Sequence, residues 1–117
     1  MSSVLSEIVV DVNDLPRMAE FWSAVLELPA AFEDGVAEMV LPTGQSFLLV
    51  PVPEPKTVKD RIHLDLSPRG CDQAEEVARV RALGATPADV GQGPEDSWVV
   101  LADPEGNEFC ILSGRRD

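Results

Sequence analysis

The side chains most able to do chemistry are few in this sequence. It contains one histidine, His63, and two cysteines, Cys71 and Cys110, together with 21 acidic and 9 basic residues. An imidazole near carboxylates has its cationic form favoured, which suits ligand recognition or proton transfer. A single histidine in a strand is nevertheless more often a hydrogen-bonded structural residue than a ligand or a base. Catalysis by His63 therefore remains a hypothesis that depends on its surroundings.

Alternation along strands predicts which reactive side chains share a face, because neighbouring residues point to opposite sides. Around the histidine, Ile62, Leu64 and Leu66 are apolar, which leaves His63 and Asp65 on the other side. The same parity groups residues of three other strand-like runs: Glu7, Val9 and Asp11; Ser46, Leu48 and Val50; and Glu108, Cys110 and Leu112. Together these faces are rich in carboxylates.

The first half of the chain is predicted to fold as βαβββ. A β-branched run at 7–12 leads into Asn13-Asp14 and Pro16, which are typical of a helix start. Apolar residues at three- and four-residue spacing predict a helix over 14–28. Its core-facing side chains would include Met18, Phe21, Trp22 and Val25. Three β-like runs follow, at 30–33, 36–41 and 46–50.

The second half repeats this order after a connector, 51–60, that carries three prolines. Residues 61–67 alternate like a strand, and 71–83 has a helical pattern. The apolar positions of that helix are Ala74, Val77, Ala78 and Val80. Three β-like runs return at 86–90, 97–102 and 108–112, with a hairpin turn at 103–107. Trp98 opens the seventh strand, where it serves either as a core residue or as a stacking surface for a flat or cationic ligand.

The two halves also match residue by residue. Residues 41–50 lie over 102–112 once one residue is inserted, so that glycine, amide and phenylalanine coincide. The same comparison places 7–10 over 63–66, each followed by a helix. A repeat this long is typical of a duplicated module related by pseudo-twofold symmetry.

Composition excludes several classes of protein. The formal net charge of −12 opposes phosphate backbones, so nucleic acid is not an expected partner. No run approaches the ~20 apolar residues of a membrane helix, and the first residues lack the features of a signal peptide. With two cysteines there is no disulfide framework. We expect one cytoplasmic domain that contacts neither nucleic acid nor membrane.

Four stretches of the chain resemble the vicinal-oxygen-chelate superfamily, also called glyoxalase/bleomycin-resistance/dioxygenase proteins, and its glyoxalase-like subgroup in particular. They are residues 10–15 leading to Phe21-Trp22, 61–66, 82–85 and 103–109. The resemblance covers nearly the whole chain. It implies an α+β fold in which two βαβββ modules form curled mixed sheets around a cavity, often completed by dimerisation. On this basis we expect a homodimer of a single glyoxalase-like domain made of module one (1–50), a linker (51–60) and module two (61–117).

Metal-dependent members of the superfamily hold one divalent ion in the cavity. The ligand positions carried over onto this chain are Glu7, Leu48, His63 and Cys110. Leu48 has no donor atom, so the pattern is broken, although Glu108 lies on the same face as Cys110 and is a candidate replacement for it. We therefore expect no cofactor, with a divalent metal held by Glu7, His63 and either Cys110 or Glu108 as the alternative.

Two functions from different classes follow from the resemblance. The first is a metal-free, bleomycin-resistance-like protein whose acidic, partly apolar cavity binds a small molecule and favours a cationic one. The second is a metal-dependent lyase, isomerase or dioxygenase with His63 as its catalytic residue. A regulatory or assembly module is a third, weaker alternative, since no partner motif is present. The residues predicted to contact the ligand are Glu7, Asp11, Leu48, His63, Asp65, Trp98, Glu108 and Cys110.

The charge of the expected cavity predicts its ligand preference. Its carboxylates would be opposed only by His63 and Arg61 at the strand edge. Such a cavity attracts cations and repels an anionic thiol conjugate such as that of glutathione. Glyoxalase I activity is therefore not expected.

Overall fold

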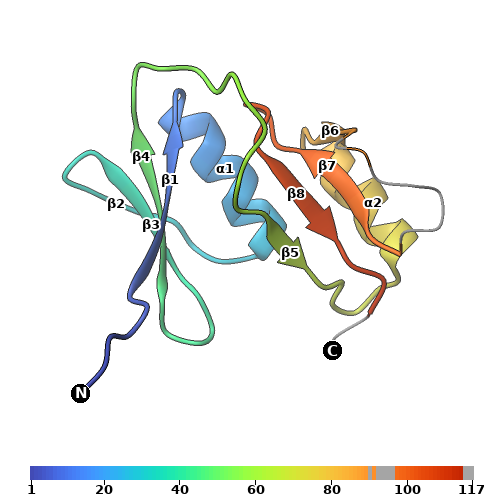
Figure 1. Ribbon diagram of the computed structural model, residues 1–117, viewed down its shortest axis with the longest axis horizontal. Coiled ribbons are helices and arrows are strands. Elements are labelled where there is room, and N and C mark those ends of the chain that lie inside the picture. Colours follow the sequence, from blue (N-terminus) through green and yellow to red (C-terminus); the bar gives the residue numbers. More distant parts are fainter. Residues whose placement is uncertain (90, 92–96, 115–117) are drawn as a thin grey trace. The chain divides into compact units, whose positions relative to one another are not determined.

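Two four-stranded mixed sheets, each accompanied by one helix, make up the fold (Figure 1). The computed structural model describes residues 1–89, 91 and 97–114. The chain divides into two units, Met1–Pro55 and Lys56–Asp117. The α+β class and the repeated βαβββ order are thereby confirmed. The division falls inside the predicted linker, so that Lys56–Asp60 belongs to the second unit.

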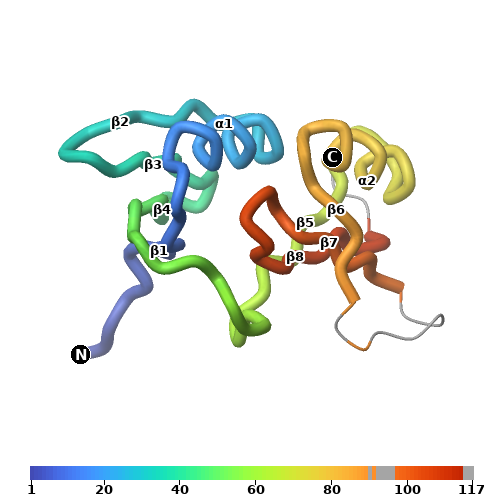
Figure 2. The backbone as a smooth tube through the Cα atoms, turned by 90° about the horizontal axis from the view of Figure 1, so that it is seen from above, coloured from blue at the N-terminus to red at the C-terminus, as the bar shows by residue number. Residues whose placement is uncertain are grey.

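Unit one contains the elements β1 (Glu7–Val12), α1 (Leu15–Leu26), β2 (Ala31–Glu33), β3 (Val36–Val40) and β4 (Ser46–Pro51). The strand order is β1-β4-β3-β2. β1 and β4 run parallel, and the other neighbours are antiparallel. α1 packs on one face of this sheet, against β3 and β4 (Figure 2). The opposite face is therefore the one that unit one leaves uncovered.

Local signals explain both ends of α1. The Asp14 side chain accepts a hydrogen bond from the Arg17 N–H at 3.2 Å, and Pro16 lies in the first turn. The helix ends at Glu27, which is left-handed at φ 53°. The predicted core face is confirmed: Trp22 is buried with its ring centroid 5.7 Å from that of Phe47 on β4. This packing fixes which face of the sheet is apolar.

Unit two contains the elements β5 (Leu64–Leu66), α2 (Gln73–Ala82), β6 (Thr86–Pro87), β7 (Val99–Ala102) and β8 (Glu108–Ile111). The strand order is β5-β8-β7-β6, with β5 and β8 parallel and the other neighbours antiparallel. Neither α1 nor α2, the helices of the described residues, is long and apolar enough to cross a membrane.

α2 is held by polar contacts more than by an apolar face. Asp72 and Glu75 form a capping box, and the Gln73 Nε2 donates to the carbonyls of Ser97 and Ile111 at 2.8 and 3.0 Å. The predicted apolar face is only partly right. Val80 is fully buried, but Ala74 and Ala78 are exposed, because they lie outside the helix face that carries Glu76 and Val80.

Three strand predictions in unit two were too long. The strand expected at 61–67 is reduced to β5, and Ile62, which was assigned to its apolar face, is 79% exposed. The strand expected at 97–102 begins at Val99, so Trp98 precedes it and is 40% exposed. Of the strand expected at 86–90, only β6 is strand among the described residues, and Val90 lies outside them.

The repeat is closer than the sequence comparison indicated, because no insertion is needed. Leu41 donates to the carbonyl of Gln45 at 2.8 Å, and Asp103 donates to the carbonyl of Asn107 at 2.9 Å. Each turn closes on a glycine with positive φ, Gly44 at 99° and Gly106 at 93°. The predicted hairpin turn at 103–107 is thus confirmed, and the inserted residue was unnecessary. Ser46 and Glu108 occupy equivalent positions at the start of β4 and β8.

Candidate functional site

The uncovered face of the first sheet carries the acidic candidates of unit one. Glu7, Val9 and Asp11 lie beside Ser46, Leu48 and Val50 in the parallel register of β1 and β4. Glu38 on β3 is level with Leu48. Val9 is 51% exposed and Val40 is 58% exposed. The face therefore alternates carboxylates with accessible apolar side chains, and its four strands contain no lysine, arginine or histidine.

A shallow depression of about 200 Å³ lies on this face beside the β2–β3 hairpin. Its lining residues are Ala31, Glu33, Asp34, Val36, Glu38 and Leu48. The Ser46 hydroxyl donates to the Glu38 carboxylate, which fixes one carboxylate at the edge of the depression. Leu48, which was predicted to contact the ligand, supplies apolar surface there. The geometry suits an apolar group that carries positive charge.

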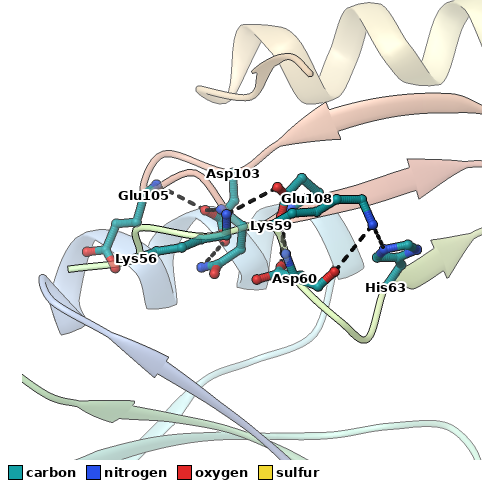
Figure 3. Close-up of polar contacts among 8 residues, drawn as sticks. Lys56, Lys59, Asp60, His63, Asp103, Glu105 and Glu108 are labelled. Carbon is teal, nitrogen blue, oxygen red and sulfur yellow. Dashed lines mark hydrogen bonds and ion pairs between the residues drawn. The ribbon is translucent and has the colours of Figure 1, made fainter. Parts of the chain in front are cut away.

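In unit two, Glu108 is held by the segment that precedes β5 (Figure 3). The Lys56 ammonium lies 3.1 Å from Glu108 Oε1, and the Asp60 N–H donates to Oε2 at 3.1 Å. In return, the Glu108 N–H donates to Asp60 Oδ2 at 3.1 Å. The Lys56 and Glu108 side chains are only 19% and 11% exposed. We call Lys56, Asp60 and Glu108 the clasp.

The clasp shifts the pKa values of its two carboxyls in opposite directions. Burial raises the pKa of Asp60 above its ordinary value, and the neighbouring Glu108 charge raises it further. Burial acts in the same sense on Glu108, but the N–H of Asp60, its own N–H and Lys56 together outweigh it and lower the pKa of Glu108. The surroundings therefore favour the charged form of Glu108 and disfavour that of Asp60.

His63 lies just before β5 and is exposed. Its Nε2 is 3.1 Å from the Lys59 Nζ, which also lies 3.5 Å from the Asp60 carbonyl (Figure 3). An ammonium can donate to Nε2 only when the imidazole is neutral with its proton on Nδ1.

Asp65 and Cys110 are register partners on β5 and β8. Cys110 is 7% exposed. Burial raises the pKa of its thiol, and the Asp65 carboxylate raises it further, against an opposing effect of Lys59. The thiol therefore stays protonated near neutral pH, which disfavours a nucleophilic step by Cys110.

The predicted site residues thus fall into two groups. Glu7, Asp11 and Leu48 share one face in unit one, whereas His63, Asp65, Glu108 and Cys110 belong to unit two. Trp98 precedes β7 and is half-exposed. The expectation that only His63 and Arg61 oppose the acidic side chains was wrong, because Lys56 and Lys59 lie beside Glu108 and His63.

Sequence reasoning treated Lys56, Lys59 and Asp60 as parts of a connector and missed their role. Lys56 and Glu108 are 52 positions apart, and no periodicity links them. The available signal was the cluster of two lysines and an aspartate immediately before the histidine. In an otherwise acidic chain this local change of charge marks a segment that contacts carboxylates.

The residues present do not fit the divalent ion that the superfamily implies. Leu48 has no donor atom. Glu108 is paired with Lys56, and the His63 Nε2 contacts an ammonium. A second cation at either group would be repelled by the lysine already there. Across 1–89, 91 and 97–114, no group of three or more His, Cys, Asp or Glu side chains is arranged to hold a metal ion.

A family model described as a glyoxalase-like domain matches residues 7–112. A comparison with curated proteins found no match. Among solved structures, a glyoxalase/bleomycin resistance protein from Albidiferax ferrireducens T118 is 24% identical, with a TM-score of 0.66 over 94% of this chain and 98% of that one.

Two further structures share the fold at lower identity. A glyoxalase/bleomycin resistance protein/dioxygenase family enzyme from Burkholderia phytofirmans PsJN is 19% identical, with a TM-score of 0.70 over 93% of this chain and 97% of the other. The fosfomycin resistance protein FosX from Listeria monocytogenes, complexed with Mn(II) and sulfate, is 17% identical, with a TM-score of 0.75 over 97% and 94%. At these identities the likeness concerns the fold alone.

Proposed function

The chain belongs to the glyoxalase-like family, and from that premise we propose that it is a small-molecule-binding protein that works without a resident metal and prefers cationic, partly apolar ligands. One observation carries this proposal. The uncovered face of the first sheet presents Glu7, Asp11 and Glu38 around accessible Val9 and Leu48, with no basic residue on its strands. A flat or aliphatic ammonium compound would satisfy both the charge and the apolar surface.

The contributions of charge and of apolar area to binding affinity can be separated by their dependence on salt. The attraction between an ammonium and exposed carboxylates weakens with salt, because the Debye length falls from about 10 Å at 0.1 M to about 3 Å at 1 M. The apolar contribution does not weaken in this way. A ligand that uses both should therefore lose part of its affinity, but not all of it, at high salt.

A thermal-shift screen of matched compounds tests the proposal. Benzylammonium and benzoate have similar size and opposite charge, and both are compared at low salt. The cation is expected to stabilise the protein and the anion is not. Glu7→Gln and Asp11→Asn should each reduce the shift, whereas Glu75→Gln on α2, outside the face, should not. Greater stabilisation by benzoate, or cation shifts unchanged by both substitutions, would contradict the proposal.

A metal-dependent lyase, isomerase or dioxygenase is the second candidate. It is favoured by the position of His63 immediately before β5, equivalent to that of Glu7 on β1, and by the Mn(II) bound in the FosX structure. Elemental analysis of dialysed, untagged protein separates the two candidates. Stoichiometric Zn, Ni, Mn or Fe that is lost in a His63→Ala variant would establish the enzyme and overturn the metal-free proposal.

We also propose that the protein is a homodimer, as the family resemblance implies. A second copy would add surface to the shallow depression of unit one, which is open as it stands. Light scattering at micromolar concentration is expected to give a mass of about twice 12.6 kDa. A monomer at that concentration would contradict this proposal while leaving the ligand preference open to its own test.

A further inference from the structure

The Lys56 ammonium occupies the place at Glu108 where an external cation would bind. It lies 3.1 Å from Oε1, and the second carboxylate oxygen is engaged by the Asp60 N–H. Both side chains of the ion pair are largely buried, with 19% and 11% of their surface exposed. A carboxylate in this position retains little solvent, so it depends on its partner for stabilisation of its charge.

The equivalent position in unit one shows which backbone hydrogen bond the clasp replaces. There the Ser46 N–H donates to the Ser6 carbonyl at 3.1 Å, which continues the strand ladder. In unit two the Glu108 N–H donates instead to the Asp60 side chain. The carboxyls of Asp60 and Glu108 are thereby brought together, and their mutual repulsion favours a positive charge beside them.

We infer that Lys56 is a built-in cation of unit two, and that its removal opens a cation-binding site formed by the Glu108 and Asp60 carboxylates. The site would accept a primary alkylammonium, which reproduces the lysine head group. It would also accept a hard divalent ion that prefers oxygen ligands. This inference is independent of the proposed function, which rests on side chains of unit one.

Chemical rescue provides the test. In a Lys56→Ala variant, n-propylammonium has the length of the deleted side-chain atoms and is added at fixed ionic strength, with tetramethylammonium as a cation too large for the same place. The variant is expected to melt several degrees lower than wild type. Propylammonium should recover at least half of that loss, and neither wild type nor Lys59→Ala should respond in the same way.

The double variant Lys56→Ala/Glu108→Gln decides whether the rescue occurs at the clasp. It lacks the carboxylate charge, so propylammonium should have no more effect on it than on wild type. An equal response of the single and double variants, or no response of the single variant, would overturn the inference.

A second variant covers the case in which the alanine variant does not fold. Lys56→Met keeps the apolar stem and removes the charge, and Mn²⁺ alone is the probe. Calorimetric titration should show Mn²⁺ binding at least tenfold tighter to Lys56→Met than to wild type, with the gain lost on adding Glu108→Gln. Equal Mn²⁺ affinity of Lys56→Met and wild type would overturn the inference. Because no unit-one residue is changed, its failure would leave the benzylammonium result unaffected.

Discussion

The equivalent faces of the two sheets differ in solvent exposure and in charge pairing. In unit one it is open: Val9 is 51% exposed and the neighbouring acidic residues have no basic partner on the strands. In unit two, Val100 and Cys110 on that side are 4% and 7% exposed, and Glu108 is paired with Lys56. Two copies of one βαβββ plan therefore present one accessible acidic face and one largely buried face on which Glu108 is paired with Lys56, whereas Asp65 on the edge strand stays exposed.

The contrast indicates that the role of a carboxylate depends on which groups of the chain contact it. Glu7 and Glu108 were both predicted to contact a ligand, on the same parity argument. Glu7 is exposed on β1 and is available to an outside cation. Glu108 is committed to Lys56 and Asp60. In the first case an acidic side chain is a recognition group, and in the second it is a structural one.

The largest expected effect tests which phenylalanine of the first sheet belongs to its buried aromatic core. Phe47 is 2% exposed and contacts Trp22, so Phe47→Ala should destabilise the protein by about 3–5 kcal/mol. Phe32, on β2 of the same sheet, is 60% exposed, and Phe32→Ala should change stability by less than about 0.5 kcal/mol. Urea unfolding measures both, and similar losses would contradict the assignment of the two phenylalanines.

The next effect compares the two acids directly. Glu108→Gln removes the charge partner of the largely buried Lys56, so we expect a loss of about 1–3 kcal/mol. Glu7→Gln on the exposed end of β1 should change stability by less than about 0.5 kcal/mol. Chemical denaturation at pH 7 and low salt measures the difference. If Glu7→Gln costs as much as Glu108→Gln, the proposed contrast between the units is wrong.

The contribution of the clasp to folding stability should depend on pH in two opposing ways. Asp60 has a raised pKa, so its contribution to stability is present below its ordinary value of 3.8 and is lost as pH rises through its folded pKa. Glu108 has a lowered pKa, so its contribution is present above its ordinary value of 4.5 and is lost as pH falls through its folded pKa.

Asp60→Asn isolates the first part, because the amide oxygen can still accept the Glu108 N–H. Relative to wild type, this variant should become progressively more stable as pH rises from 3.8 through the folded pKa of Asp60. Glu7→Gln, whose site lies outside the clasp, is the control for general charge effects. Thermal melts at half-unit pH intervals measure the difference, and a constant offset from wild type would contradict the raised pKa.

The smallest effect concerns Ile62, which the alternation pattern placed in the core. Because Ile62 is 79% exposed, Ile62→Ser should change stability by less than about 0.5 kcal/mol. The matched substitution Leu66→Ser, at a half-buried position of β5, should cost clearly more. Equal losses in thermal melts would show that residues 61–63 belong to the strand after all.

Most of the fold could be predicted from the sequence because its signals are local. Asp14 and Pro16 start α1, Asp72 and Glu75 cap α2, and glycine with an amide closes each hairpin turn. The errors arose where alternation continued beyond the hydrogen-bonded strand. Residues 61–63 alternate like β5, but the Asp60 side chain takes the N–H that would have extended the ladder.

For the candidate site, the sequence by itself determined which side chains share a face, since strand parity fixes that once the apolar face is known. It thereby placed Glu7 with Asp11 and Asp65 with Cys110. Only the tertiary structure decided which carboxylate remains accessible to an outside ligand. That outcome depends on a contact between residues 52 positions apart, in which a lysine of the connector reaches Glu108. Such a contact follows from the path of the chain in space, because Coulomb attraction acts over a few ångströms whatever the separation in sequence.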